Sequence, residues 1–251
     1  MEKIYFNNFE NQKIWGIIEE PNQIKNEIII IIHGAGANKE SGPKHIAEEL
    51  IKRNINSIRI DLDDQGESEP RHENSTISSY VKTVETTINY LKKQRYKTIN
   101  LIGTSFGGIV AMATALKRKE IKKILLRAPV ADYYKRVLDR YSKDEIKEFK
   151  KQGFYNYTKS NGKKLKITYK RIEDSKKYNM YEKAKKIQIP VLIIHGTDDK
   201  NVNYKTSEKL IKEFPKGRLI LIKNADHSLG INGDYRKSLK ILGDWFENKL
   251  S

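Results

Sequence analysis

The stretch Gly103-Thr104-Ser105-Phe106-Gly107-Gly108 places a serine between two glycines in the pattern G-x-S-x-G. The apolar run Thr98–Ile102 before it has the length of a strand, and Ile109–Leu116 after it has the composition of a helix. Small residues at positions 103 and 107 allow a sharp strand-to-helix turn that exposes the serine hydroxyl. The pattern in this context predicts an α/β fold with Ser105 as nucleophile at the carboxyl edge of the sheet.

Outward from this turn, short apolar runs alternate with segments of helix length. The runs predicted as strands are Ile28–Ile32, Ser57–Asp61, Thr98–Ile102, Lys123–Ala128, Val191–His195 and Leu219–Ile222. This alternation is typical of βαβ units, in which helices cover both faces of a parallel sheet. Lys3–Phe9 and Lys13–Glu19 are expected to add an antiparallel edge hairpin, which gives a mostly parallel sheet of about eight strands.

One long segment interrupts the alternation. Residues 132–186 are too long for a simple connection between two core strands and are rich in tyrosine. We expect them to form a small inserted cap, and residues 1–131 and 187–251 to form the core. The elements expected in the cap are a helix over Tyr141–Lys151 and two strands, Phe154–Lys159 and Lys164–Lys170, joined at Ser160-Asn161-Gly162.

The end of the chain, Tyr235–Leu250, has apolar residues at helical spacing and is expected to close the core. The amino terminus lacks the apolar core of a signal peptide, and the strongest apolar run, Ile28–Ile32, is too short to span a bilayer. We therefore expect a cytoplasmic protein without a membrane span.

The formal net charge is +17, a value that raises the question of a nucleic-acid partner. The lysines are scattered in pairs along the chain rather than clustered, so solvated faces are expected and nucleic-acid binding is not. The absence of cysteine excludes disulfides, a thiol nucleophile and zinc-thiolate sites. A homodimer is compatible with the sequence.

A serine nucleophile needs a base within hydrogen-bond reach, and the base needs an acceptor that orients it. In this fold the acid and then the histidine follow later strands. His227 lies in the loop after Leu219–Ile222 and is the candidate base, while Asp198 and Asp199 compete for the acid in the loop after Val191–His195. Either aspartate could instead cap a turn or the following helix.

The other four histidines are assigned different roles. His33 and His195 each end a strand before a glycine, which favours a packed or hydrogen-bonded structural role. His45 and His72 fall in polar segments and are expected at the surface.

Two backbone N–H groups should stabilise the oxyanion of an acyl-transfer reaction. Phe106 and Ala35 are the candidate donors, the latter in the small-residue loop Gly34–Asn38. This loop lacks the phosphate-binding and dinucleotide-binding signatures, so no cofactor is expected. Asp61, Asp63 and Asp64 have no matching ligand set, so no metal is expected and Asp61 is interpreted as a structural acceptor.

Taken together these motifs resemble the α/β-hydrolase superfamily, and most of all its bacterial cinnamoyl and feruloyl esterase branch. The motifs that carry the resemblance are His33-Gly34-x-Gly36-Ala37-Asn38, Gly103-x-Ser105-x-Gly107-Gly108, His195-Gly196-Thr197-Asp198-Asp199 and Ala225-Asp226-His227. The resemblance implies that Asp199 is the catalytic acid and that Tyr169 contacts the substrate under the cap. The chain departs from the branch at Ala35, where an aromatic residue is usual, and at Asp64, where its D-x-x-G-x-G-x-S turn has glycine.

The expected function is carboxylic ester hydrolysis through an acyl-enzyme, on small-molecule esters of cinnamoyl, feruloyl or other small acyl groups. A peptidase or thioesterase with the same three residues is the alternative among enzymes. A non-catalytic basic binding protein on the same fold is the alternative outside them.

Overall fold

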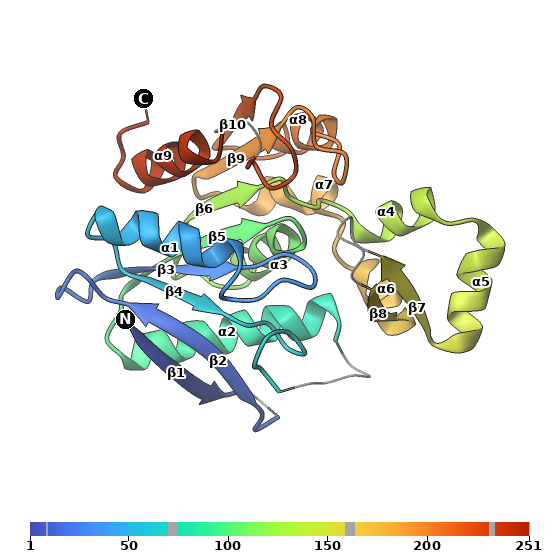
Figure 1. The fold of residues 1–251 in the computed structure, drawn as a ribbon, viewed down its shortest axis with the longest axis horizontal. Coiled ribbons are helices and arrows are strands. Elements are labelled where there is room, and N and C mark those ends of the chain that lie inside the picture. The colour runs from blue at the N-terminus through green and yellow to red at the C-terminus, as the bar shows by residue number, and fades with distance from the viewer. Residues whose placement is uncertain (9, 70–74, 159–163, 231–233, 251) are drawn as a thin grey trace.

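A computed structural model of the chain describes residues 1–8, 10–69, 75–158, 164–230 and 234–250 (Figure 1). Its central sheet has the strand order β1-β2-β4-β3-β5-β6-β9-β10. β2 is antiparallel to both neighbours, and the other pairs are parallel. The strands are β1 (Glu2–Asn7), β2 (Lys13–Glu19), β3 (Glu27–Ile32), β4 (Ser57–Ile60), β5 (Thr98–Thr104), β6 (Ile121–Arg127), β9 (Val191–Gly196) and β10 (Gly217–Ile222). The predicted eight-stranded, mostly parallel sheet is confirmed.

The isoleucine run of β3 shows why the sheet is covered on both faces. Ile28, Ile30 and Ile32 belong to an apolar cluster with α2, α3 and α8, whereas Ile29 and Ile31 belong to a second cluster with α1 and α9. All five side chains are fully buried, because successive side chains of a strand point to opposite faces. The helices are α1 (Gly42–Lys52), α2 (Ile77–Lys93), α3 (Phe106–Ala115), α8 (Lys205–Ile211) and α9 (Asp234–Phe246).

The segment between β6 and β9 forms a lobe to one side of the sheet (Figure 1). Its elements are α4 (Tyr133–Arg140), α5 (Lys143–Gln152), β7 (Phe154–Thr158), β8 (Lys164–Thr168), α6 (Tyr169–Ser175), α7 (Met180–Lys183) and the 3-10 turn η1 (Ala184–Lys186). β7 and β8 pair antiparallel, and a small apolar cluster is centred on Tyr155 and Ile167. This is the segment expected to act as a cap, and that role stays a prediction.

The lobe is fixed to the core through α6. The Asp174 carboxylate accepts hydrogen bonds from the backbone N–H of Ser78, at 2.8 Å, and from the Ser78 hydroxyl, at 2.6 Å. Ser78 lies in the first turn of α2, where backbone N–H groups have no partner within the helix and an acidic side chain is favoured. The contact therefore joins α6 to the first turn of α2.

The sequence predictions differ from the structure mainly inside the lobe. The strand predicted over Lys164–Lys170 ends at Thr168, and Tyr169 begins α6 instead. Helix α4 was not predicted; it begins after Asp132, whose carboxylate accepts from the backbone N–H of Lys135 at 2.9 Å. The predicted turn Ser160-Asn161-Gly162 lies outside the described residues. The carboxyl-terminal helix ends at Phe246, before the predicted Leu250.

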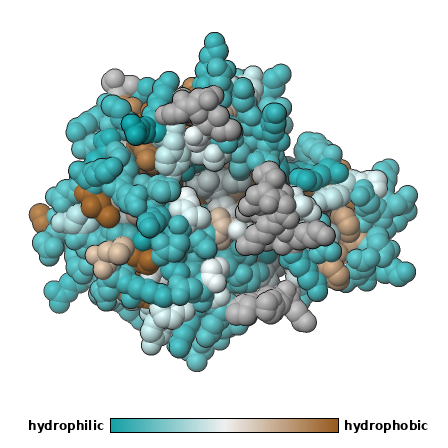
Figure 2. All heavy atoms as spheres, in the orientation of Figure 1, coloured by the Kyte–Doolittle hydropathy of each residue, from teal (hydrophilic) through white to brown (hydrophobic). Residues whose placement is uncertain are grey.

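Hydrophilic residues cover most of the face shown in Figure 2, and hydrophobic residues form small separate groups on it. Among the described residues, no helix combines the length and the apolar composition that a membrane crossing requires.

Candidate active site

Ser105 lies at the sharp turn between β5 and α3, as the sequence predicts. Its φ of 54° and ψ of −116° are strained for a residue with a side chain. The conformation is held by the Ser105 N–H, which donates to Arg127 O at 2.8 Å, and by the Ser105 carbonyl, which accepts from Gly108 and Val130. A Cβ on Gly107 would lie 2.5 Å from the carbonyl oxygens of Ile32 and His33, so a larger residue has no room there.

The structure brings Ser105, His227 and Asp199 together, although each comes from the carboxyl end of a different strand. His227 Nε2 lies 3.0 Å from Ser105 Oγ, and His227 Nδ1 lies 2.6 Å from Asp199 Oδ2. Because Asp199 accepts at Nδ1, that nitrogen carries the proton and Nε2 is free to accept one from the serine. The three groups have the geometry that general-base activation of a hydroxyl requires.

The Asp199 carboxylate is buried and fully hydrogen-bonded. Its Oδ1 accepts from the backbone N–H groups of Asn201 and Val202, both at 2.8 Å, and its Oδ2 accepts from His227 and His195. Burial alone would raise the pKa of Asp199, but the hydrogen bonds from His195 and His227 outweigh it and hold the pKa well below its usual range. Asp199 is therefore an anion facing His227, whereas Asp198 is exposed and points its carboxylate toward Thr197.

His195 is a second histidine in contact with Asp199. The sequence predicted only a structural role for it. Its side chain is fully buried, with Nε2 at 3.0 Å from Asp199 Oδ2 and 2.9 Å from Val202 O. Two acceptors at Nε2 place the proton there, and Nδ1 accepts from the Ser207 hydroxyl at 2.7 Å. The predicted hydrogen-bonded role of His195 is correct. The sequence did not indicate that Asp199 would be one of its partners.

The remaining histidines lie apart from this arrangement. His33 is buried, and its Nε2 accepts from the backbone N–H of Leu62 at 3.0 Å, in agreement with a structural role. His45 is exposed on α1 beside Glu48, as expected of a surface residue. His72 lies outside the described residues.

The two candidate oxyanion donors lie on either side of Ser105. Phe106 is the first residue of α3, so its N–H has no partner within the helix. Ala35 follows Gly34, where a Cβ would lie 3.3 Å from Ser105 Cβ, which places the loop directly against the serine. Ala35 and Phe106 both line a cavity of about 200 Å³. Both residues therefore lie near Ser105, and their role as donors to an oxyanion stays a prediction.

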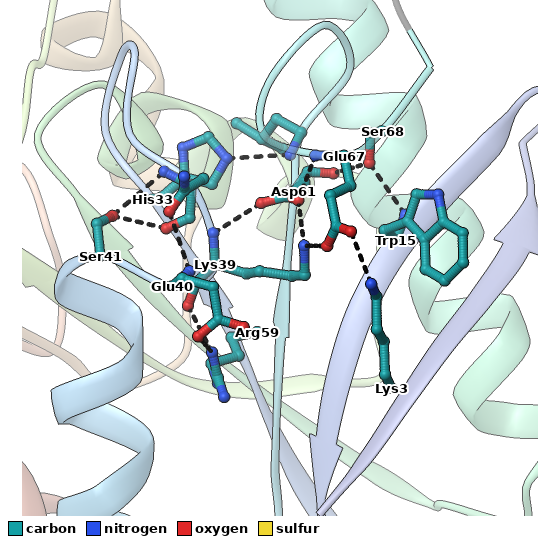
Figure 3. A network of polar contacts seen from close by, with 12 residues as sticks. Lys3, Trp15, His33, Lys39, Glu40, Ser41, Arg59, Asp61, Glu67 and Ser68 are labelled. Atoms are coloured by element: carbon teal, nitrogen blue, oxygen red, sulfur yellow. Dashed lines mark hydrogen bonds and ion pairs between the residues drawn. The ribbon is translucent and has the colours of Figure 1, made fainter.

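A buried ion pair anchors the loop that carries Ala35 (Figure 3). Lys39 Nζ donates to Asp61 Oδ2 at 2.6 Å and also contacts Glu67, and the Lys39 backbone N–H donates to Asp61 Oδ1 at 2.7 Å. Asp61 also accepts from the Glu67 backbone N–H, so it is the structural acceptor that the sequence suggested. Hydrogen bonds from Lys3 and Lys39 lower the pKa of Glu67 to about 2.

Polar side chains that were not predicted also line this cavity. They include Asp64 and Tyr80 from the core and Lys166 and Arg171 from the lobe. Asp64 occupies the position where the resemblance leads one to expect glycine, with a φ of 59° in the left-handed region. The one sequence signal near Arg171 is its place two residues after Tyr169, for which the resemblance implies a substrate contact.

Tyr169 itself is half-buried against the apolar cluster of the lobe, and its backbone N–H donates to Gly153 O at 2.8 Å. Of the described residues, those that line the cavity include its neighbours Ile167 and Arg171 but not Tyr169. Its contact with substrate stays a prediction. No cluster of histidine and acidic side chains among the described residues is arranged to hold a metal ion.

Comparison with known proteins assigns the chain to a family. The family model for serine aminopeptidase S33 matches residues 23–181, which is more than half of the chain. This chain belongs to that α/β-hydrolase family. It is therefore a hydrolase, and the predicted superfamily is confirmed. No curated protein sequence is detectably similar to it.

Solved structures share the fold of this hydrolase at low sequence identity. Est1E from Butyrivibrio proteoclasticus, in a structure with bound ferulic acid, has a TM-score of 0.84 at 20% identity, over 98% of this chain and 99% of its own. Alpha/beta hydrolase domain-containing protein 10 from mouse has a TM-score of 0.84 at 19% identity, over 99% of each chain. Both similarities cover the lobe as well as the core.

Proposed function

We propose that this hydrolase cleaves esters of small carboxylic acids by acyl transfer through Ser105. The observation that carries the proposal is the hydrogen-bonded chain from Ser105 Oγ through His227 to Asp199, with distances of 3.0 and 2.6 Å. A serine esterase needs its base within hydrogen-bond reach of the hydroxyl from which it takes the proton. Est1E, a structural neighbour with bound ferulic acid, supports an ester as the substrate class.

The reaction has two steps. Ser105 Oγ attacks the ester carbonyl carbon while His227 Nε2 takes the hydroxyl proton, and the N–H groups of Ala35 and Phe106 donate to the oxyanion. His227 then gives the proton to the leaving alkoxide, which departs as an alcohol and leaves an acyl group on Ser105. Water attacks the acyl-enzyme with His227 again as base, and the acid departs as Ser105 recovers its proton. Asp199 orients His227 throughout.

The test combines active-site labelling with turnover. A fluorophosphonate probe should label the wild type on the peptide that contains Ser105, and Ser105→Ala should abolish both labelling and hydrolysis of p-nitrophenyl butyrate. Ser228→Ala is the matched control, because Ser228 hydrogen-bonds Asp226 and does not contact Ser105. A folded wild type that is neither labelled nor active would refute the proposal.

A second candidate function is aminopeptidase activity with the same residues, favoured by the description of the matching family. Aminoacyl p-nitroanilides should then be cleaved with a larger kcat/KM than p-nitrophenyl butyrate. We expect the reverse, because both cationic side chains of the cavity wall, Lys166 and Arg171, would repel a substrate's free amino group.

A further inference from the structure

A buried cation lies in the cavity wall beside the proposed oxyanion site. Arg171 is only 4% exposed, yet it lines the cavity together with Ala35 and Phe106. Its guanidinium carbon lies 5.7 Å from the centre of the Phe106 ring and 5.2 Å from that of Tyr80. Phe106 directly follows Ser105, so the guanidinium lies close to the residue next to the proposed nucleophile.

Among the described residues, the hydrogen-bond acceptors of Arg171 are neutral groups. Its Nε donates to Ser75 O at 2.8 Å and its Nη2 to Tyr80 Oη at 2.5 Å, and both of these acceptors are neutral. No described residue accepts a hydrogen bond from Nη1. A guanidinium carries five N–H donors in a fixed plane, and a buried cation is costly unless an anion accepts from it.

The one carboxylate near Arg171 in the described part of the cavity wall is occupied elsewhere. Asp64 Oδ2 forms an ion pair with Arg171 Nη2 at 3.7 Å, a separation too long for a hydrogen bond. The Asp64 oxygens accept from Tyr80 Oη at 3.2 Å, from Gln65 Nε2 at 2.7 Å and from the Ser75 hydroxyl. Asp64 thus holds the Tyr80 hydroxyl that receives Arg171, and no described residue accepts a hydrogen bond at the other edge of the guanidinium.

A second cationic residue, the exposed Lys166, is among the described residues of the cavity wall. Lys166 lines the cavity from β8, and its ammonium lies 4.1 Å from the centre of the Phe154 ring. Apart from His33 and Tyr80, three ionisable residues line the described wall. Two of them, Lys166 and Arg171, are cations, and the third, Asp64, is an acid. A ligand that enters this cavity meets a net positive wall.

We infer that the cavity binds an acyl group that ends in a carboxylate, so that the substrates are half-esters of small dicarboxylic acids. The inference rests on the proposed function, because the ester carbonyl lies at Ser105 while the distal carboxylate accepts from Arg171. Guanidinium groups are suited to this contact, since they can donate two parallel hydrogen bonds to one carboxylate. Hydrolysis releases an alcohol and a dicarboxylate, with the same two steps at Ser105.

The experiment compares monoethyl glutarate with ethyl pentanoate, which has the same chain length and a methyl group in place of the carboxylate. Hydrolysis is followed by pH-stat titration for the wild type, Arg171→Met and Lys170→Met. Lys170 is the matched control, because it lies on the same helix, is exposed, and its replacement removes the same charge. The wild type should prefer monoethyl glutarate, and Lys170→Met should retain that preference.

Arg171→Met should lower kcat/KM for monoethyl glutarate by about 10- to 100-fold, the usual effect of losing hydrogen bonds to a charged group. Its kcat/KM for ethyl pentanoate should fall by a smaller factor, since a neutral chain gains little from the charge. Asp64→Asn, which removes the opposing carboxylate, should increase the preference for monoethyl glutarate. Arg171→Lys should retain part of the preference for monoethyl glutarate that Arg171→Met loses.

Product inhibition gives a measure that needs no variant. Glutarate should inhibit hydrolysis of ethyl pentanoate by the wild type at lower concentration than pentanoate does. Equal inhibition by glutarate and pentanoate would overturn the carboxylate site. An Arg171→Met variant whose kcat/KM falls by the same factor for both esters would do the same. In either case, turnover of ethyl pentanoate by the wild type would still support acyl transfer at Ser105. Failure of the wild type on both esters, with Ser105 unlabelled by fluorophosphonate, would overturn both proposals.

Discussion

At the residue scale, a single carboxylate connects two histidines. Asp199 Oδ2 accepts from His227, which faces Ser105, and from His195, which faces α8. His195 thereby holds the carboxylate from the side opposite His227. The orientation of the proposed base thus depends on a buried residue that does not reach Ser105.

Asp199→Asn should lower kcat on p-nitrophenyl butyrate by a factor on the order of 10⁴, because an amide can present its NH₂ to His227 and favour the wrong tautomer. Asp198→Asn is the control, since the neighbouring carboxylate is exposed and contacts Thr197. Its kcat should equal that of the wild type. Steady-state kinetics with circular dichroism as the test of folding would check both; the reverse pattern would assign the acid to Asp198.

The depressed pKa of Asp199 also predicts how stability responds to acid. The pKa of Asp199 is lowered on folding, so its contribution is fully present above the unfolded value of about 3.9 and is lost as pH falls through the folded value. In urea unfolding, the stability advantage of the wild type over Asp199→Asn should be constant from about pH 7 to pH 5 and shrink below about pH 4. An advantage that grew on acidification would show that burial keeps Asp199 protonated.

At the element scale, the loop between β3 and α1 is held by charge rather than by apolar packing. Lys39 and Asp61 are both buried, with side chains 2% and 0% exposed, and they join this loop to the turn after β4. The loop also carries Ala35, so the ion pair helps to hold the segment that contains one proposed oxyanion donor.

Lys39→Met should lower the free energy of unfolding by about 3–5 kcal/mol, because it leaves the buried Asp61 carboxylate without its cation. Lys3→Met breaks the ion pair of Lys3 with Glu67, in which both side chains are about half exposed, and should cost less than about 1 kcal/mol. Urea denaturation of the two variants measures the difference. Equal losses would mean that the Lys39 pair is as well solvated as the surface pair.

At the scale of the whole molecule, local patterns determined most of what could be predicted. The elbow at Ser105 and the buried strand Ile28–Ile32 follow from short stretches of sequence, and chain order indicated His227. The burial of Arg171 could not be predicted, because it depends on α6 packing over α2 and no neighbour in sequence requires it. The same holds for the pairing of Lys39 with Asp61, two residues in separate loops.

The net charge of +17 is a property of the whole molecule, and the structure offers a reason why it should not create a nucleic-acid site. Several lysines on helix surfaces pair with acids one turn away, among them Lys135 with Asp139, Lys147 with Asp144 and Lys240 with Asp244. Another, Lys39, is buried. A nucleic-acid surface instead needs adjacent, unneutralised cations, because affinity comes from releasing the counterions of successive phosphates.

We therefore expect no saturable binding of a fluorescent duplex or single-stranded oligonucleotide at about 150 mM salt, measured by anisotropy, and only weak association at low salt. Ester hydrolysis should respond differently. Screening acts weakly inside a buried cavity, so the preference for monoethyl glutarate should persist at a salt concentration that abolishes any oligonucleotide binding. Tight oligonucleotide binding with a steep dependence on salt would instead show that the scattered lysines act together as one basic face.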